Sequence, residues 1–307
     1  MNSLAEVSGL TLGTAQLGLR YGIANKKGKL TDEEALNILQ VAYSEGINSF
    51  DTAFVYGESE RILGRFLSSL KNGLYPVVIS KLPRISVVRK ERVRKQIEKY
   101  LNTSLQRLGI ERMPVYLLHS ASDLSAFDGE VIRVLSEMKK DGLIGAIGVS
   151  VYHPEEAKNI LDMEEIEVIQ LPLSIFDRRF LKSDLLTALK SRGKFIFARS
   201  IFLQGLIFLS PRELPRTLES AARYLKILRE FVRKEEMSID ELAMGFVRSF
   251  PQISSIVIGV EDLNQLKGNI KLYKKGGLSI DVLEKVIQTF PDMPETIVNP
   301  YHWREKK

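Results

Sequence analysis

Short apolar runs alternate along the whole chain with segments whose apolar positions repeat at helical spacing. Runs of the kind that form buried strands occur at 10–15, 48–52, 76–81, 115–119, 145–150, 168–173, 194–200 and 255–260. Amphipathic helical patterns follow them at 32–45, 58–70, 87–108, 129–140, 154–162, 183–191, 239–249 and 263–273. The pattern predicts eight strand–helix pairs in succession.

Several predicted helices carry recognisable end signals. Thr31 precedes an acidic Asp-Glu-Glu turn and is expected to cap the first helix, which Gly46 closes. Asp141-Gly142 and Arg192-Gly193 are expected to end two helices shortly before a predicted strand, and Asp262 is placed to cap the helix after the eighth strand. These signals favour the same strand–helix boundaries as the periodicity.

Eight strand–helix pairs predict the α/β class and, within it, a closed parallel (β/α)8 TIM barrel. An open doubly-wound sheet shares this local pattern, but the glycines in 13–18 have the wrong spacing for its Gly-x-Gly-x-x-Gly phosphate fingerprint. Helical patterns at 214–234 and 278–288 predict an insertion after strand seven and a helical tail. No linker divides the chain, so residues 1–307 are expected to form a single domain.

Composition narrows the possible chemistry. The chain has 307 residues, of which 44% are hydrophobic and 27% are charged, as in an ordinary globular protein. It contains no cysteine and three histidines. The absence of cysteine excludes a disulfide framework, an iron–sulfur cluster and thiolate zinc, and no metal site is expected.

A formal net charge of +6 leaves two interpretations, an anionic partner or scattered surface lysines. The densest basic stretch, 89–99, alternates with acids in a helical pattern, which is typical of a solvated helix face. The first nine residues lack the apolar core of a signal peptide, and no apolar run is long enough to span a bilayer. We therefore expect a cytoplasmic protein without a nucleic-acid or membrane partner.

Polar residues follow three neighbouring predicted strands. Asp51 ends the second strand, with Tyr56 five residues later, and Lys81 and His119 end the third and fourth. Taken singly, each has an ordinary explanation, such as a helix cap, a packed ring, a lysine that reaches solvent or a satisfied core histidine. In a barrel, however, strand ends converge on one rim, where these four groups would form a proton-transfer site.

The four groups suit a specific chemistry. A phenol has a pKa of about 10, and a nearby ammonium lowers that pKa by stabilising the anion. Lys81 could act in this way on Tyr56, with Asp51 holding Lys81 charged and oriented. His119 could then donate a hydrogen bond to a substrate oxygen as negative charge develops on it.

These residues and their order resemble the aldo-keto reductases. The resemblance covers the chain from Leu12 to about Asn269 and rests on Gly13-Thr14, Asp51-Thr52-Ala53, Tyr56-Gly57, Lys81, Leu118-His119, Gly148-Val149-Ser150 and Gln170. It implies a reductase of an aldehyde, ketone or sugar carbonyl, working in either direction. In that reaction Tyr56 is the general acid/base, and Asp51, Lys81 and His119 complete a catalytic tetrad.

The resemblance also implies a nicotinamide cofactor site. It assigns Gly13, Thr14 and Ser200 to that site, and Ser150 and Gln170 to the nicotinamide carboxamide. The chain departs from the family at two positions, because Val151 replaces the usual asparagine and Arg199 replaces the aromatic that usually stacks on the nicotinamide. A guanidinium can also lie flat against a ring, so Arg199 is expected to be a cofactor contact.

The segment 258–269 resembles the family's adenosine-phosphate loop and helix start. Gly259, Gln265 and Asn269 are implied cofactor contacts, and Glu261 stands where the family commonly has a basic residue. An acid is repelled by a 2′-phosphate but can bind a 2′-hydroxyl. NADP(H) is the family default, and Glu261 makes NAD(H) a serious alternative.

The substrate and the protein's role stay open at the level of sequence. Loop residue Tyr21 and the terminal 301–303 could wall the pocket for a sugar or phosphorylated carbonyl, or residues 301–307 could be a frayed end. Besides an active reductase, a cofactor-binding regulatory or scaffold subunit with little turnover is the competing function. The filled tetrad favours turnover.

Overall fold

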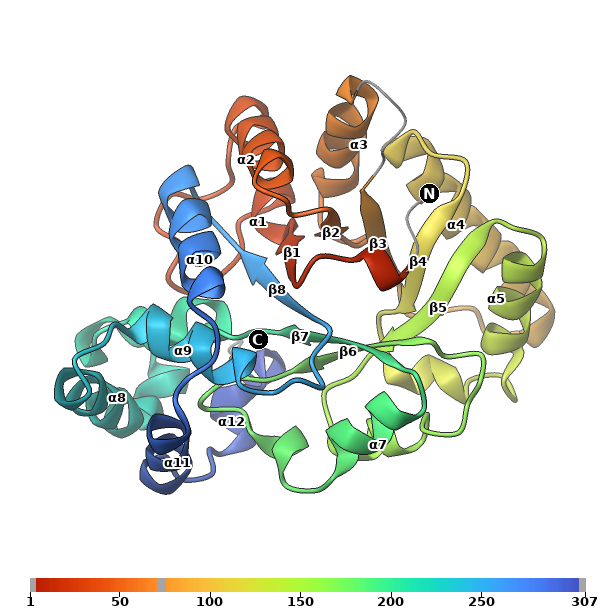
Figure 1. Ribbon diagram of the computed structural model, residues 1–307. Helices are drawn as coiled ribbons and strands as arrows, with labels where there is room; N and C mark the ends of the chain where they lie inside the picture. Colours follow the sequence, from red (N-terminus) through yellow and green to blue (C-terminus); the bar gives the residue numbers. More distant parts are fainter. Residues whose placement is uncertain (1–3, 71–75, 304–307) are drawn as a thin grey trace.

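The computed structural model describes residues 4–70 and 76–303, within which eight parallel strands close into a barrel (Figure 1). The strands are β1 (Leu10–Gly13), β2 (Ser49–Asp51), β3 (Val77–Leu82), β4 (Met113–Leu118), β5 (Ile144–Ser150), β6 (Val168–Pro172), β7 (Phe195–Arg199) and β8 (Ser255–Gly259). Each strand pairs with the next, and β8 pairs with β1. The predicted TIM barrel is confirmed.

Helices surround the barrel (Figure 1). The α-helices are α1 (Ala15–Gly18), α2 (Asp32–Ser44), α3 (Ser59–Ser69), α4 (Val93–Leu108), α5 (Glu130–Lys140), α6 (Pro154–Lys158), α7 (Leu185–Ser191), α8 (Ala222–Lys234), α9 (Ile239–Arg248), α10 (Leu263–Lys275), α11 (Ile280–Thr289) and α12 (Glu295–Val298). Short 3-10 helices are η1 (Leu4–Glu6), η2 (Lys90–Arg92), η3 (Ala121–Leu124), η4 (Arg179–Leu181), η5 (Leu203–Phe208), η6 (Pro211–Glu213), η7 (Arg216–Ala221) and η8 (Pro300–Trp303). The insertion after β7 and the helical tail are both as predicted.

The expected helix ends are present. Thr31 accepts a hydrogen bond from the Glu34 backbone and Glu34 accepts one from the backbone of Thr31, which forms a capping box at the start of α2. Asp262 accepts from the backbone N–H of Gln265 at the start of α10. Gly46 and Gly142 have φ of 92° and 81°, the left-handed backbone that ends a helix before a strand.

Two predicted helices are shorter in the structure. The helix expected over 87–108 begins at Val93, because the Gln96 side chain accepts hydrogen bonds from the backbone of Ser86 and Val87 and holds them in a loop. The helix expected over 154–162 ends at Lys158, after which the chain tightens into i→i−3 bonds such as that from Leu161 to Lys158.

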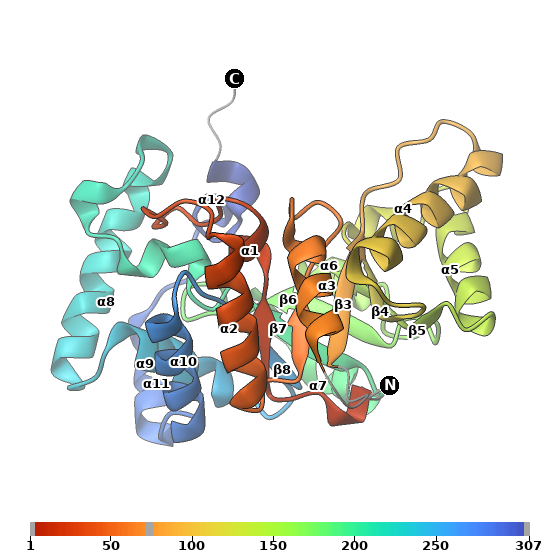
Figure 2. The ribbon, with the colours of Figure 1, turned by 90° about the horizontal axis from the view of Figure 1, so that it is seen from above.

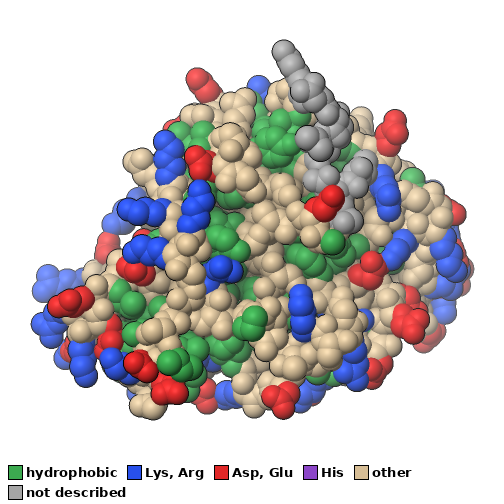
Figure 3. All heavy atoms as spheres, viewed as in Figure 1, with side chains coloured by type: hydrophobic (Ala, Val, Ile, Leu, Met, Phe, Trp, Pro, Cys, Tyr) green, Lys and Arg blue, Asp and Glu red, His purple; other side chains and the backbone are tan. Residues whose placement is uncertain are grey.

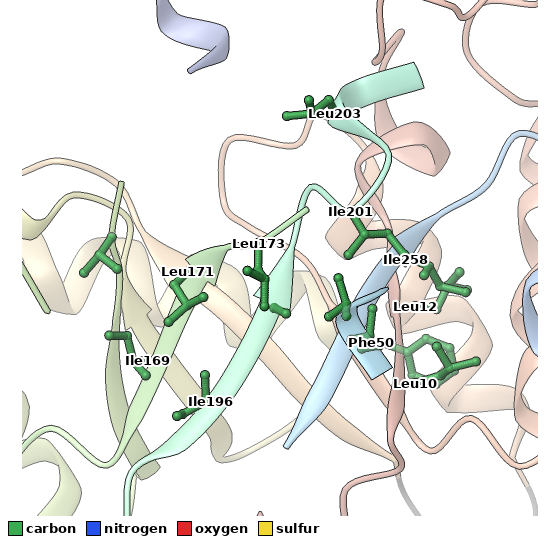
Figure 4. Packing of buried hydrophobic residues seen from close by; sticks show 14 of the residues in the cluster. Leu10, Leu12, Phe50, Ile169, Leu171, Leu173, Ile196, Ile201, Leu203 and Ile258 are labelled. Atoms are coloured by element: carbon green, nitrogen blue, oxygen red, sulfur yellow. The ribbon is translucent and has the colours of Figure 1, made fainter. Parts of the chain in front are cut away.

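The barrel has an apolar layer on each side of its strands. Outward side chains such as Leu12, Phe50, Ile169 and Ile258 pack between the strands and the helices (Figure 4). Inward side chains form a second cluster, Val77, Ile79, Val115, Leu117, Ala146, Val168 and Phe197, against which Leu4 and Val7 pack. The N-terminal segment thus closes the lower end of the barrel, opposite α12 (Figure 2).

The charges lie on the outside of this framework. In the basic stretch 89–99, most charged side chains are exposed, as expected for a solvated helix face. Figure 3 shows positive and negative side chains interspersed, with Lys and Arg gathered on the left, where Figure 1 places α8. Within the described part of the chain, no helix is long and apolar enough to cross a membrane.

Candidate active site

The alternation of side chains along each strand explains how polar groups meet at one end of the barrel. Ile79 points inward, so Lys81, two residues later, does so as well, one layer higher. By the same alternation, Ser150 on β5, Gln170 on β6 and Arg199 on β7 also point inward. We call the inward apolar cluster the apolar plug. The layer above it is therefore polar, and it lies at the carboxyl ends of the strands.

Asp51, Lys81 and Gln170 form a buried network in this layer. The Lys81 ammonium donates to Asp51 Oδ1 at 2.6 Å and to the Thr52 carbonyl at 2.9 Å. Gln170 Nε2 donates to the same Asp51 oxygen at 2.8 Å. Only 1% of the Lys81 side chain and 7% of the Asp51 side chain are exposed, so the low dielectric strengthens the pairing.

Tyr56 lies in the loop above this network, and two glycines fix its position. A Cβ on Gly18 would stand 1.9 Å from the Tyr56 carbonyl oxygen, so only glycine allows α1 to approach so closely. Gly57 has φ of 58°. The Lys81 ammonium is 5.0 Å from the centre of the Tyr56 ring, which forms a T-shaped pair with the ring of His119 at 6.0 Å between centroids. The predicted tetrad is thus brought together.

The protonation states differ in one respect from the sequence expectation. Burial and the nearby Asp51 carboxylate raise the pKa of Tyr56, although the cation of Arg199 opposes the shift. Lys81 was expected to lower that pKa, but its own charge is neutralised by Asp51, and burial lowers the pKa of Lys81. Tyr56 therefore holds its proton at neutral pH, as a proton donor must.

His119 is neutral in this site. Burial, followed by the positive charges of Lys81 and Arg199, lowers its pKa to about 3. A neutral imidazole can still donate a hydrogen bond through one ring nitrogen. His119 can thus bind a carbonyl oxygen without adding a charge.

A cavity of about 620 Å3 opens over these residues. Its walls include most of the residues singled out from the sequence, namely Gly13, Asp51, Tyr56, His119, Ser150, Gln170, Arg199, Ser200, Gly259, Glu261, Gln265 and Asn269. Lys81 lies beneath the floor, and Thr14 is fully buried, donating to the Asp51 carbonyl at 2.9 Å and sharing a hydrogen bond with Ser59. The Thr14 side chain therefore supports β2 rather than the cavity.

One end of the cavity lies over the start of α10. Glu261, Gln265 and Asn269 line it, and open space surrounds Gly268 where a Cβ would stand. Lys27 approaches from the loop after α1, but its ammonium is paired with Asp262 at 2.9 Å. The cavity wall here is acidic and polar.

Arg199 occupies the wall near Tyr56. Its guanidinium lies 4.1 Å from the centre of the Tyr152 ring and donates to the Val151 carbonyl at 3.0 Å. Tyr152 in turn contacts Tyr301, with ring centroids 4.9 Å apart. Trp303 is buried and donates to the Ile297 carbonyl, whereas Tyr301 is 65% exposed and none of 301–303 lines the cavity. Residues 304–307 lie outside the described residues.

A family model described as the Aldo/keto reductase family matches residues 9–289. The chain belongs to this family. Members are NAD(P)H-dependent oxidoreductases, and this protein is accordingly an enzyme acting on carbonyl or CH–OH groups. The resemblance predicted from the sequence is confirmed.

Relatives of this aldo/keto reductase include two bacterial proteins. "Uncharacterized oxidoreductase YqkF" of Bacillus subtilis (strain 168) is 25% identical over 289 residues, 85% of this chain and 89% of the relative. "NADH-specific methylglyoxal reductase" of Escherichia coli (strain K12) is 30% identical over 219 residues, 66% of this chain and 65% of the relative. The solved structure of aldo-keto reductase AKR11C1 from Bacillus halodurans (holo form) shares the fold, with a TM-score of 0.75, 23% identity and coverage of 97% and 96%.

Sequence reasoning missed some of this reductase's cavity walls. Tyr152, Gln16 and Phe202 line the cavity but were not named from the sequence. Tyr21, suggested from the sequence as a pocket wall, does line it. Tyr152 could have been found, since it stands two residues beyond the end of β5, where barrel side chains reach the active-site rim. Gln16 carries no comparable signal, because α1 is too short to show a periodic pattern.

Proposed function

We propose that this single-domain barrel transfers a hydride between a nicotinamide cofactor and a carbonyl carbon, with Tyr56 donating the proton to the carbonyl oxygen. The observation that carries the proposal is the position of Tyr56, between the buried Lys81–Asp51 pair and neutral His119 at the wall of one cavity. An aldehyde, a ketone or the open form of a sugar is the expected substrate class.

Each residue has a separate role in this reaction. A bound nicotinamide would supply the hydride. His119 donates a hydrogen bond that orients the carbonyl oxygen, and the Tyr56 hydroxyl gives its proton to that oxygen as negative charge develops there. The hydroxyl keeps its proton until the carbonyl oxygen takes it, because burial and Asp51 raise the pKa of Tyr56. Lys81 and Asp51 hold each other in place beneath the Tyr56 ring.

The cavity suits such a cofactor. It runs from the tetrad to the start of α10, where the backbone N–H groups of a first helical turn favour phosphate. Ser150 and Gln170 line the cavity, and by the resemblance they would bind the carboxamide. Since one N–H of Gln170 donates to Asp51, its amide oxygen and its second N–H are left for the cofactor.

The adenosine end supports NADH over NADPH. Glu261 lines it, Asp262 follows, and the neighbouring cation, Lys27, is bound to Asp262. A 2′-phosphate would meet a carboxylate there, whereas a 2′-hydroxyl could donate to it. Fluorescence titration of the purified protein should give a lower Kd for NADH than for NADPH.

Replacing Tyr56 with phenylalanine tests the proton donor. Tyr56→Phe should bind cofactor with unchanged affinity while kcat falls by about 100-fold or more, since general acid catalysis contributes about 10²–10⁴. Phe54→Leu, at a neighbouring ring of the same loop, is the control and should lose far less. Near-normal kcat in Tyr56→Phe would refute the assignment. Cofactor binding by the wild type without turnover of any carbonyl would support the scaffold role instead.

A further inference from the structure

Arg199 is unusual among the cavity walls. Among the described residues that line the cavity, Arg199 is the sole lysine or arginine, while Asp51, Asp240 and Glu261 are the acids. It sits at the end of β7, two residues beyond the buried Phe197, and its Cα pairs with that of Pro172 on β6. The substrate region therefore contains one fixed positive charge.

The guanidinium is held ready rather than free to move. Its central carbon lies 4.1 Å from the centre of the Tyr152 ring, NH2 donates to the Val151 carbonyl, and NH1 donates to Ser200 Oγ at 3.3 Å. Ser200 itself has φ of 62°, a left-handed conformation that a non-glycine residue adopts only when its surroundings enforce it. These contacts fix the direction of the Arg199 side chain before any ligand binds.

The charge of Arg199 has no carboxylate partner in the described part of the chain. No aspartate or glutamate there lies within ion-pair distance of it, and Asp51 is engaged by Lys81 and Gln170. Two of the five guanidinium N–H groups are used in the hydrogen bonds above, which leaves three for a ligand. A half-buried arginine of this kind is stabilised by an anion, which it can bind through two parallel hydrogen bonds.

Arg199 is also close enough to act on the reacting groups. Its charge is among the causes that lower the pKa of His119 and oppose the rise in the pKa of Tyr56. An anion at Arg199 and a carbonyl at Tyr56 would thus share one small cavity and can belong to one small molecule.

We propose that Arg199 binds an anionic group, a carboxylate or a phosphate, carried by the carbonyl substrate itself. This inference rests on the proposed function and adds to it a substrate class: short acidic aldehydes or ketones. Arg199 is then the residue that determines specificity, and Tyr152, braced by Tyr301, is the surface that positions it.

Paired substrates test this proposal. The carboxylate arm compares 4-carboxybenzaldehyde with 4-carbamoylbenzaldehyde, and the phosphate arm compares glyceraldehyde 3-phosphate with glyceraldehyde. In the wild type, kcat/KM should favour the anionic member of at least one pair by about tenfold or more, and the arm that does so identifies the anion. Arg199→Gln should abolish that preference, a loss of about 10- to 100-fold as expected for a charge-assisted hydrogen bond, while the neutral member changes less than threefold.

Two further variants separate charge from geometry. Arg199→Lys should recover part of the preference, since it keeps the charge and loses the planar fork. Arg192→Gln removes a positive charge from an exposed ion pair with Asp162, outside the cavity wall. It should leave the kcat/KM preference within both substrate pairs unchanged. An equal fall of kcat/KM for charged and neutral substrates in Arg199→Gln, together with weaker NADH binding, would overturn the proposal and assign Arg199 to the cofactor.

Calorimetry keeps the anion site testable without turnover. Benzoate and inorganic phosphate are titrated into the enzyme–NADH complex of the wild type and of Arg199→Gln. If the wild type binds either anion and Arg199→Gln does not, the anion site is supported. If in addition no aldehyde is reduced, the proposed function fails while the anion site stands. Equal binding, or none, in both proteins would overturn the anion site.

Discussion

The buried Lys81–Asp51 pair allows its structural role to be separated from its chemical role. Lys81→Met keeps the length of the side chain and removes the ammonium. It leaves Asp51, whose side chain is 7% exposed, with Gln170 as its remaining side-chain donor. The variant therefore contains a buried carboxylate that has lost its cationic partner.

The size of the effect follows from that burial. Removing one member of a buried ion pair costs about 3–5 kcal/mol, whereas replacing both members by uncharged groups of similar volume is often nearly neutral. We therefore expect Lys81→Met to lower the free energy of unfolding by about 3 kcal/mol or more. The double variant Asp51→Asn/Lys81→Met should lie within about 1 kcal/mol of the wild type, because the new asparagine side chain keeps an amide oxygen that can accept from Gln170.

The wild type, the two single variants Lys81→Met and Asp51→Asn, and the double variant form a double-mutant cycle. Equilibrium urea unfolding, followed by circular dichroism, measures the free energy of unfolding of each protein. A coupling free energy of about 2 kcal/mol or more is expected, and additivity of the two single effects would refute the reasoning. Stability and activity should separate in the double variant, since its fold recovers while its kcat stays far below that of the wild type. Recovery of kcat as well would show that Tyr56 does not need Lys81.

Two further predictions concern pH and cofactor choice. The pKa of His119 is about 3 in the folded protein and about 6.5 when unfolded, so the unfolded state binds the extra proton between these values and stability falls as pH drops below 6.5. Between pH values of about 7.5 and about 5 the wild type should lose up to about 2 kcal/mol more unfolding free energy than His119→Gln, and equal losses would contradict a buried neutral imidazole. Glu261→Lys should raise the ratio of kcat/KM for NADPH to that for NADH, and an unchanged ratio would mean that Glu261 does not face the ribose.

Much of the fold could be predicted because each barrel strand is short, apolar and bounded by turn residues. The expected strand at 168–173 is β6, Val168–Pro172, and the one at 145–150 differs from β5 by one residue. Helix starts were predictable where a side chain caps them, as at Thr31. They were not predictable where a distant side chain intervenes, as Gln96 does for Ser86 and Val87.

The site was predictable for a related reason. Parallel strands all end on the same rim, so polar residues at strand ends must converge there even when they are far apart in sequence. Lys81 and Gln170 meet at Asp51 because each stands at an inward position one layer above the apolar plug. Charge and burial within that layer could not be read from the sequence, and they reverse the expected direction of the pKa shift at Tyr56.

The positions of the substrate-facing groups depend on a different part of the structure. The tetrad is fixed by strand ends and by the tight loop that Gly18 and Gly57 permit. Tyr152 reaches the cavity from the segment after β5, where no periodic pattern predicts its position, and Tyr301 contacts it from η8. Arg199 depends on both parts of the structure, because its backbone ends β7 while its side chain is oriented by the Tyr152 ring. A change at such a position should alter which carbonyl compound is accepted while leaving Tyr56 in place, which is why the proposal assigns substrate specificity to Arg199 and not to the tetrad.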